Sequence, residues 1–466
     1  MKGYTFLLLI LLIGTFERCF PQSDSGQVLT LATFIQSVKK YHPVARLAGI
    51  QVDKASAGLM SAKGNFDPLL QFDANSKTFD SKNYYYYNNP ELYIPLPVGN
   101  LKAGVEYNGG DLLSPEISKG KTSYLGVELP LAKGLLMDKR RAILQQAKIF
   151  TRQSVQERLI IQNDLLFDAY TAYLLWAGAY QQYAIYCKFV EIAGKRLRLV
   201  RIAFAGGERA LMDTTEAFTQ LQNYQLLQNE AFLKWKNAGL ELSNYLWKEG
   251  DSISILEDSQ LPEKLQPFSD MSDKNAEDLI AKSTRQNPSL KIYDHKLNIL
   301  EVERKLKLQS LLPYFSVKTN LLNKDYNVFK NTNSAFFENN YKWGVEFKIP
   351  FFLREARGDY KKVQLKMKET NLELLLKRKQ TESKIHSYLN EYNALKQQLS
   401  IAQSMYLNYQ SLQKNEELKF SQGESSLFLV NTRESKLLEL QQKQIDLTVK
   451  YFKAKYAIEW AAGLLR

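Results

Sequence analysis

The chain has 466 residues and carries 62 Lys and Arg against 49 Asp and Glu, which gives a formal net charge of +13. The basic residues are scattered among Glu and Gln along helical stretches, and they form no cluster interleaved with aromatic side chains. We therefore expect a solvated helical surface and exclude a nucleic-acid interface.

The first 23 residues have the pattern of a secretory signal peptide. Lys2 supplies a positive charge, residues 6–13 form a short apolar core, and turn-forming residues follow around Pro21. Cys19 would be the acceptor of a lipid anchor, but charged residues precede it where such a site needs small ones. We therefore expect cleavage of residues 1–23 and an exported chain.

The composition also argues against an intrachain disulfide and against a transmembrane helix. Cys187 is the only cysteine outside the predicted signal peptide, so no intrachain disulfide is expected. No later stretch approaches about 18 continuous apolar residues, so the sequence predicts no transmembrane helix.

The rest of the chain is predicted to contain two structural repeats, each with the same order of elements. The first repeat, 24–248, comprises a short helix, a strand at 68–78, an outer loop, a strand at 122–131, a long helix at 135–204 and a helix at 210–247. A linker follows at 249–274. The second repeat, 275–466, comprises a helix at 275–310, a strand at 313–322, an outer loop, a strand at 341–350, a long helix at 355–420 and a helix at 425–464.

Matching residues support this internal two-fold repeat. Pro43 and Pro288 lie 245 positions apart, and so do Pro68 and Pro313. Later in each half, the tripeptide Gly-Val-Glu at 126–128 is matched by the same tripeptide at 344–346. A period of this length is too long for a solenoid unit, so it indicates a duplicated module.

The long helices carry an apolar stripe with alternating spacings of three and four residues. In the second repeat the stripe consists of Ile385, Tyr388, Tyr392, Leu395, Leu399, Ala402, Tyr406 and Tyr409. Such a stripe predicts antiparallel coiled-coil hairpins, each long helix being on the order of 100 Å in length. Gly206-Gly207 and Gly423 are predicted to end the long helices, because a helix commonly stops at a left-handed residue.

The four predicted strands alternate between apolar and polar residues. Val317 and Thr319, for example, interleave with Ser316 and Lys318. Four strands are too few to close a barrel, so a membrane-spanning sheet would have to pool strands from several chains. Two chains would give a plugged eight-stranded barrel, and three would give a twelve-stranded barrel with a lumen. The first outer loop, rich in Tyr and Asn, has room for a small extra hairpin around residues 101–107.

These features resemble the outer-membrane efflux protein family, the TolC-like exit ducts of Gram-negative bacteria. The best-matching segments are 341–352, which leads into a long helix, and 420–430 at the second helical turn, together with the proline-led strand entries at Pro68 and Pro313. The resemblance implies a homotrimer whose twelve-stranded barrel lies in outer-membrane lipid and continues as a periplasmic helical barrel. It also implies a passive duct that works with a periplasmic adaptor protein and an inner-membrane transporter, and no enzyme or cofactor.

The same resemblance assigns candidate functional residues. The helical turns would form the periplasmic tip that docks the adaptor, at Gly206, Gly207, Gly423, Glu424 and Ser425. Asp213 and Phe420 match a carboxylate and an aromatic residue of the entrance gate. Leu429 and Thr432 stand where relatives carry two acidic residues, so the gate is expected to lack that acidic ring.

Catalytic and metal-binding patterns are absent from the sequence. His42, His295 and His386 have no Cys or His at metal-binding spacing, and no phosphate-binding glycine loop or nucleophile elbow occurs. Two alternatives to a duct remain: a periplasmic coiled-coil adaptor, which would have a single hairpin, and a structural envelope rod, which would leave the strands unexplained. The sequence specifies neither the exported substrate nor whether the partner pump uses ATP or protons.

Overall fold

The computed structural model describes residues 28–250, 252–257, 259–265, 276–326 and 339–465. The predicted signal peptide, including Cys19, lies outside the described residues. By contacts the chain forms two compact units. We call the described residues within Met1–Arg46, Gln162–Ala281 and Ser383–Arg466 the helical unit, and those within Leu47–Ile161 and Lys282–Glu382 the sheet unit.

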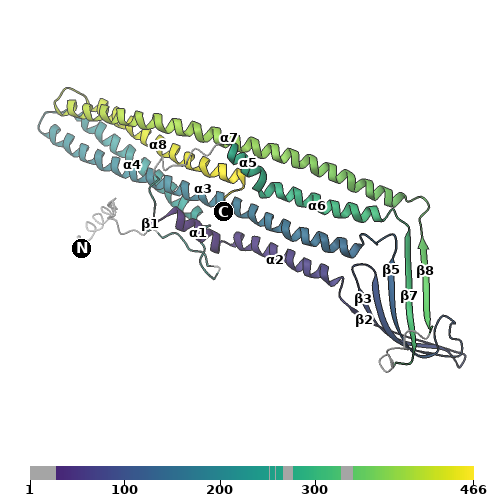
Figure 1. Ribbon diagram of the computed structural model, residues 1–466. Helices are drawn as coiled ribbons and strands as arrows, with labels where there is room; N and C mark the ends of the chain where they lie inside the picture. The colour runs from purple at the N-terminus through teal and green to yellow at the C-terminus, as the bar shows by residue number, and fades with distance from the viewer. Residues whose placement is uncertain (1–27, 251, 258, 266–275, 327–338, 466) are drawn as a thin grey trace, which may run out of the picture. The chain divides into compact units, whose positions relative to one another are not determined.

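Helices make up most of the described chain (Figure 1). They are α1 (Leu31–Tyr41), α2 (Pro43–Gly64), α3 (Lys139–Ala205), α4 (Leu211–Ser243), α5 (Ala276–Gln286), α6 (Pro288–Gln309), α7 (Arg354–Ser421) and α8 (Leu427–Ala462). The longest, α3 and α7, have 67 and 68 residues, and each contributes to both units. None of the described helices is apolar over a stretch long enough to cross a membrane.

One predicted helix is wrong: the region 275–310 contains two helices, not one. Pro288 begins α6 without a backbone donor, and the preceding residue, Asn287, has an extended backbone. The Asn287 side chain accepts a hydrogen bond from the Ser289 amide at 2.9 Å and so caps the new helix. Proline disfavours helical geometry in the residue before it, which is why α5 ends there.

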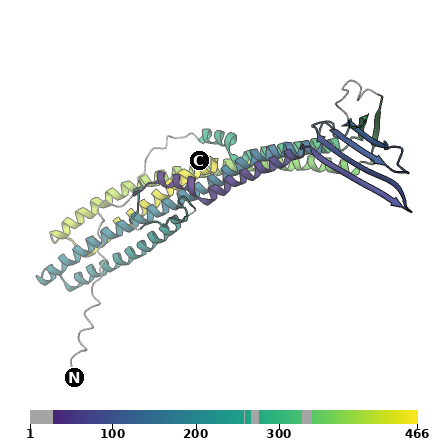
Figure 2. The ribbon, with the colours of Figure 1, turned by 90° about the horizontal axis from the view of Figure 1, so that it is seen from below.

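In the helical unit, the hairpin of α3 and α4 lies beside the hairpin of α7 and α8 (Figure 2). Aromatic rings join the two hairpins. Tyr170 of α3 stacks on Tyr456 of α8 with ring centroids 3.9 Å apart, and Phe167 of α3 stacks on Trp460 of α8 at 4.6 Å. Large rings of this kind bury much apolar area per residue, so they hold long helices together over a thin core.

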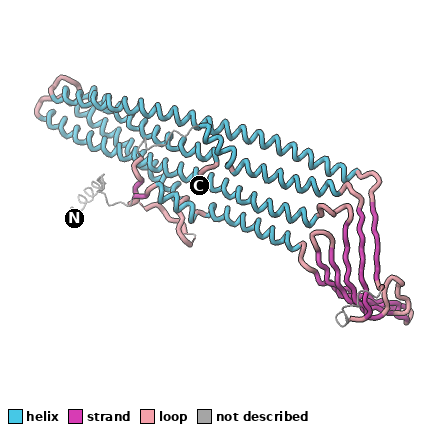
Figure 3. The backbone as a smooth tube through the Cα atoms, viewed as in Figure 1, coloured by secondary structure: helices cyan, strands magenta, loops and turns pink. Residues whose placement is uncertain are grey.

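Two sheets are described (Figure 3). A short parallel pair joins β1 (Val28–Leu29) to β6 (Leu261–Pro262) in the helical unit. The larger sheet is antiparallel, in the order β2-β3-β4-β5-β7-β8. Its strands are β2 (Leu69–Phe79), β3 (Lys82–Pro95), β4 (Asn100–Gly109), β5 (Gly120–Pro130), β7 (Tyr314–Lys324) and β8 (Tyr341–Lys348).

The expectation of four strands per chain is therefore wrong, because the larger sheet has six within the described residues. The tyrosine-rich segment expected in the outer loop is strand β3, and the expected small hairpin is formed by β3 with β4. Asp80 and Ser81 adopt positive φ angles of 51° and 60° and make a tight turn after β2. The rings of Tyr85 and Tyr87 then stack at 4.7 Å on one face of β3. Tyrosine favours strands, but a run of it lacks the alternation that identifies a strand in a sequence.

One face of the larger sheet is apolar from edge to edge. Successive strands place Leu70, Leu92, Ala103, Leu125, Leu321 and Tyr341 in one cross-strand row. A neighbouring row contains Ile94, Leu101, Val127, Thr319 and Trp343. These side chains are not covered by a core: Leu70 is 81% exposed and Trp343 is 66% exposed.

The opposite face of this sheet is polar and charged. Lys102 of β4 lies 3.4 Å from Glu128 of β5. Lys318 of β7 lies 3.5 Å from Glu128 and 3.3 Å from Glu346 of β8. The larger sheet therefore has one apolar and one charged face, and its edge strands β2 and β8 each pair on one side only within the described part of the chain.

Candidate functional site

The two helical turns of the helical unit have the same backbone geometry. Gly207 and Gly423 adopt left-handed φ angles of +79° and +82°. After each glycine the next amide donates back to the helix, from Glu208 to the carbonyl of Ala203 and from Glu424 to that of Lys419, both at 2.9 Å. This pattern satisfies carbonyls at the helix ends and requires a residue that tolerates positive φ.

A cation joins the two turns. Arg209, in the first turn, donates a hydrogen bond of 3.2 Å to the carbonyl of Phe420 at the end of α7. Its guanidinium also lies over the Phe420 ring, 4.3 Å from the centroid. Phe420 packs in turn against a small buried cluster that includes Leu197 and Leu427. The aromatic residue predicted for the gate is thus held between a cation and the core, and Arg209 was missed by the sequence analysis.

The second turn is fixed by a carboxylate. Ser425 donates to Glu416 at 2.5 Å, and the same carboxylate lies 3.8 Å from Arg433 of α8. The neighbouring Ser426 caps α8 by accepting from the amide of Leu429. The predicted tip residue Ser425 therefore links α7 to the start of α8.

The other predicted gate residues lie near these turns. Asp213 occupies the first turn of α4, where a carboxylate is stabilised by the helix dipole. Leu429 and Thr432 are exposed on α8, and Thr432 donates to the carbonyl of Phe428 at 2.8 Å. Their role at an entrance stays a prediction.

A partly buried polar cluster lies on the helices that lead to the turns. It consists of Arg196 of α3, Glu216 of α4, Glu417 of α7, and Asn431 and Glu434 of α8. Arg196 donates to Asn431 at 3.2 Å, pairs directly with Glu434, and lies 3.5 Å from Glu417. Asn431 donates to Glu216 at 2.9 Å. One guanidinium therefore connects, directly or through Asn431, side chains from all four long helices of the helical unit.

Glu434 is the most unusual member of the polar cluster, because its side chain is completely buried. Burial raises the pKa of its carboxyl, and the Arg196 guanidinium opposes that rise. A buried ion pair gains little net stability because desolvation offsets the attraction, but removal of one partner is costly. The sequence held a signal for this cluster, since Asn431 and Glu434 share the helical stripe of Val430, Leu437 and Leu438.

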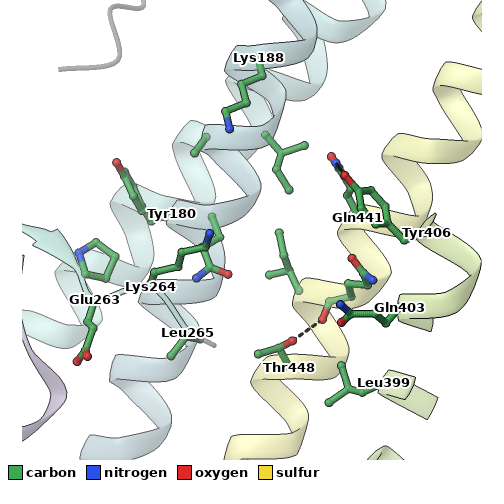
Figure 4. Close-up of a pocket in the computed structure, with 16 residues that line it drawn as sticks. Tyr180, Lys188, Glu263, Lys264, Leu265, Leu399, Gln403, Tyr406, Gln441 and Thr448 are labelled. Atoms are coloured by element: carbon green, nitrogen blue, oxygen red, sulfur yellow. Dashed lines mark hydrogen bonds between the residues drawn. The ribbon is translucent and has the colours of Figure 1, made fainter. Parts of the chain in front are cut away.

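The helical unit also contains a pocket of about 550 Å³, lined by α3, α7, α8 and residues 262–265 (Figure 4). Its polar lining is mainly uncharged, with the carboxamides of Gln403 and Gln441 and the hydroxyl of Tyr406. The Thr448 hydroxyl donates a hydrogen bond of 2.7 Å to the carbonyl of Gln444. The lining contains no histidine or cysteine, and the described residues as a whole hold no group of three His, Cys, Asp or Glu suited to a metal ion.

No family model and no curated protein matches this sequence. Solved structures do match the fold. The outer-membrane channel OprN has a TM-score of 0.66 at 12% identity, over 93% of this chain and 89% of that one. The Campylobacter jejuni outer-membrane channel CmeC has a TM-score of 0.63 at 15% identity, over 93% and 85%. The Vibrio cholerae outer-membrane protein VceC has a TM-score of 0.63 at 13% identity, over 93% and 95%.

At such identities the likeness concerns the fold. It extends over 93% of this chain in each of the three comparisons. It agrees with the mainly helical architecture with one major sheet that the sequence predicts. The chain therefore has the fold of the TolC-like outer-membrane channels, the family that its sequence resembles.

Proposed function

We propose that this protein is the outer-membrane exit duct of a tripartite efflux or type I secretion system in a Gram-negative bacterium. In this role it conducts substrates passively from an inner-membrane transporter, through a periplasmic adaptor, to the exterior. The fold supports an outer-membrane channel. The observation that carries the proposal is the larger sheet, with one apolar and one charged face and two open edges.

Lipid is the environment that suits the apolar face of this sheet. Side chains such as Phe72 and Trp343 are exposed in the protomer, and a patch of this extent is rare on a soluble monomer. The charged face suits a water-filled interior, because membrane strands alternate between lipid-facing and lumen-facing residues. Five of the six strands have at least 10 residues, and a tilted strand needs about 9–11 to cross the hydrocarbon core.

The open edges require further copies of the chain. Unpaired backbone groups are costly in lipid, so β2 and β8 must find partner strands. In an antiparallel sheet of six strands, the first and last run in opposite directions. The β8 edge of one copy can therefore pair with β2 of the next and keep the antiparallel order. A homotrimer closed in this way agrees with the family resemblance.

The helical unit would form the periplasmic tunnel wall. Its turns, with Gly206, Gly207, Gly423, Glu424 and Ser425, would dock the adaptor. Asp213, Phe420, Leu429 and Thr432 would lie at the entrance. The uncharged Leu429 and Thr432 would make this entrance less selective for cations than that of relatives with an acidic ring.

Matching element lengths support a duplicated origin. Helices α1 and α5 both have 11 residues, and α2 and α6 both have 22. Strands β2 and β7 both have 11. Two hairpins per chain also favour a duct over an adaptor, which would have one.

Two lysine substitutions on one strand, one on each face of the sheet, test this proposal. In the protomer both Phe72 and Asn75 of β2 are exposed, so a soluble protein would tolerate Phe72→Lys and Asn75→Lys about equally. In a barrel, Lys at position 72 faces lipid and costs about 2–4 kcal/mol near the bilayer midplane, whereas Lys at position 75 faces water. We expect only Phe72→Lys to lose outer-membrane insertion, measured by fractionation and by pore formation in planar bilayers. Equal behaviour of both variants, or a wild-type protein that is monomeric without detergent, would refute the duct.

A further inference from the structure

The hairpin of β3 and β4 lies inside the larger sheet, not beyond its end. It is inserted between β2 and β5, and its strands pair along most of their length with both neighbours. The resemblance implies four strands per chain, so this hairpin is an addition to the expected plan. Its position decides whether it caps the sheet or extends it.

The inserted hairpin continues both faces of the sheet. On the apolar face, Leu92 and Ala103 complete the cross-strand row between Leu70 and Leu125. On the charged face, Tyr124 of β5 donates a hydrogen bond to Glu91 of β3. A hairpin folded over the end of a barrel would have no reason to maintain this alternation.

Close packing also fixes the hairpin within the sheet. Gly104 of β4 pairs directly with Tyr124 of β5, and a Cβ at position 104 would lie 2.6 Å from the tyrosine ring. The ring therefore lies across the glycine and spans β4 to reach Glu91. In the same way, a Cβ at Gly109 would lie 2.4 Å from the Tyr86 hydroxyl. Glycine opposite an aromatic ring is a known way to stabilise a strand pair in a barrel wall.

The lengths of these strands suit a membrane wall. Strand β3 has 14 residues and β4 has 10. Both reach the roughly 9–11 residues that a tilted strand needs to span the hydrocarbon core.

From these observations we infer that β3 and β4 are wall strands, and that three copies of the chain build an eighteen-stranded barrel in place of the twelve-stranded barrel of the family plan. This inference rests on the proposed function. Six strands from each of three chains give the eighteen. Barrel diameter grows about linearly with strand number, so the outer bore would be roughly 1.5-fold wider, in the size range where barrels leave an open aqueous channel. The outer exit would then admit bulkier cargo than a twelve-stranded one.

Site-directed spin labelling tests the inference. All variants are made in a Cys187→Ser background and reconstituted in liposomes as the mature protein without residues 1–23, so that the introduced cysteine is the only one. The test pair is Lys102→Cys and Ala103→Cys on β4, and the reference pair is Val317→Cys and Lys318→Cys on β7, which the family plan also contains. We expect labels at 103 and 317 to be relaxed by oxygen dissolved in lipid, and labels at 102 and 318 by a water-soluble nickel complex.

The outcomes separate the two proposals. If the β7 pair alternates and both β4 labels are accessible to nickel, the hairpin lies outside the membrane and the inference fails while the duct stands. If neither pair alternates, the duct itself fails. Deletion of residues 82–109 gives an independent measurement, because it joins β2 to β5 with antiparallel order kept. The largest polymer that enters the pore from the outer side should then fall about 1.5-fold in radius, and an unchanged limit would overturn the inference.

Discussion

Replacement of Arg196 by Met removes the guanidinium that faces Glu434 within the polar cluster. The Glu434 side chain is completely buried, and Arg196 is its ion-pair partner. Loss of one partner of a buried pair leaves an uncompensated charge and costs about 3–5 kcal/mol. We expect Arg196→Met to lower the free energy of unfolding of the helical unit by this amount at neutral pH.

The cost should depend on pH. Burial raises the pKa of Glu434, and the guanidinium opposes the rise, so its removal raises this pKa further. A carboxyl whose folded-state pKa is raised binds more protons when folded. Its contribution to stability is fully present below the unfolded pKa, near 4.5, and is lost as pH rises through the folded value. Arg196→Met should therefore be least harmful in acid and most harmful above neutral pH.

A neighbouring position provides the matched control. Lys195 pairs with Glu191 one turn away at 2.6 Å, and both side chains are about 60% exposed. Solvent and salt screen an exposed pair of this kind, so Lys195→Met should have little effect. The double variant Arg196→Met with Glu434→Leu should recover most of the lost stability, because it also removes the buried carboxylate that would otherwise have no cationic partner.

Denaturation of the detergent-solubilised protein, followed by circular dichroism at 222 nm across a pH series, measures all of these variants. The reasoning would be refuted if Arg196→Met cost no more than Lys195→Met. It would also be refuted if the double variant were as unstable as the single one.

Three further predictions follow from the turns and the sheet. Gly423→Val places a β-branched residue at φ +82°, so export should fall while trimers still form on native gels; normal export would argue against docking at this turn. Gly104→Val drives a side chain into the ring of Tyr124, and we expect a loss of about 1–3 kcal/mol, seen as a lower temperature for the heat-induced mobility shift of the barrel on gels. Arg209→Ala frees Phe420 from its cation, so single-channel conductance should rise, and an unchanged conductance would remove Phe420 from the gate.

Local features of the sequence were enough to predict the helical hairpins. The three-four stripe around Tyr392 and Leu399 identifies long helices because it repeats over many turns, and both of those side chains are buried. The positions of the two helical turns could be predicted because Gly207 and Gly423 supply the left-handed conformation that ends a helix. The break before Pro288 is equally local, but helical patterns on both sides of it predict one continuous helix.

Strand β3 shows where local reading fails. Its Tyr and Asn residues do not alternate in hydropathy, so the sequence predicts a loop there. They form a strand because β2 and β4 supply hydrogen-bond partners on both sides. The number of strands in the larger sheet therefore depends on pairing between segments that the sequence does not show to be neighbours.

The candidate site divides in the same way. The sequence determined which residues make the turns, since helix stops depend on the conformational freedom of single residues. The tertiary structure alone decided that Arg209 meets Phe420 and that Arg196 meets Glu434, because these partners are more than 200 positions apart in the chain. Backbone conformation is set mainly by neighbours in the chain, whereas contacts between charges and rings are set by tertiary packing. The contacts that join the two hairpins are of this second kind.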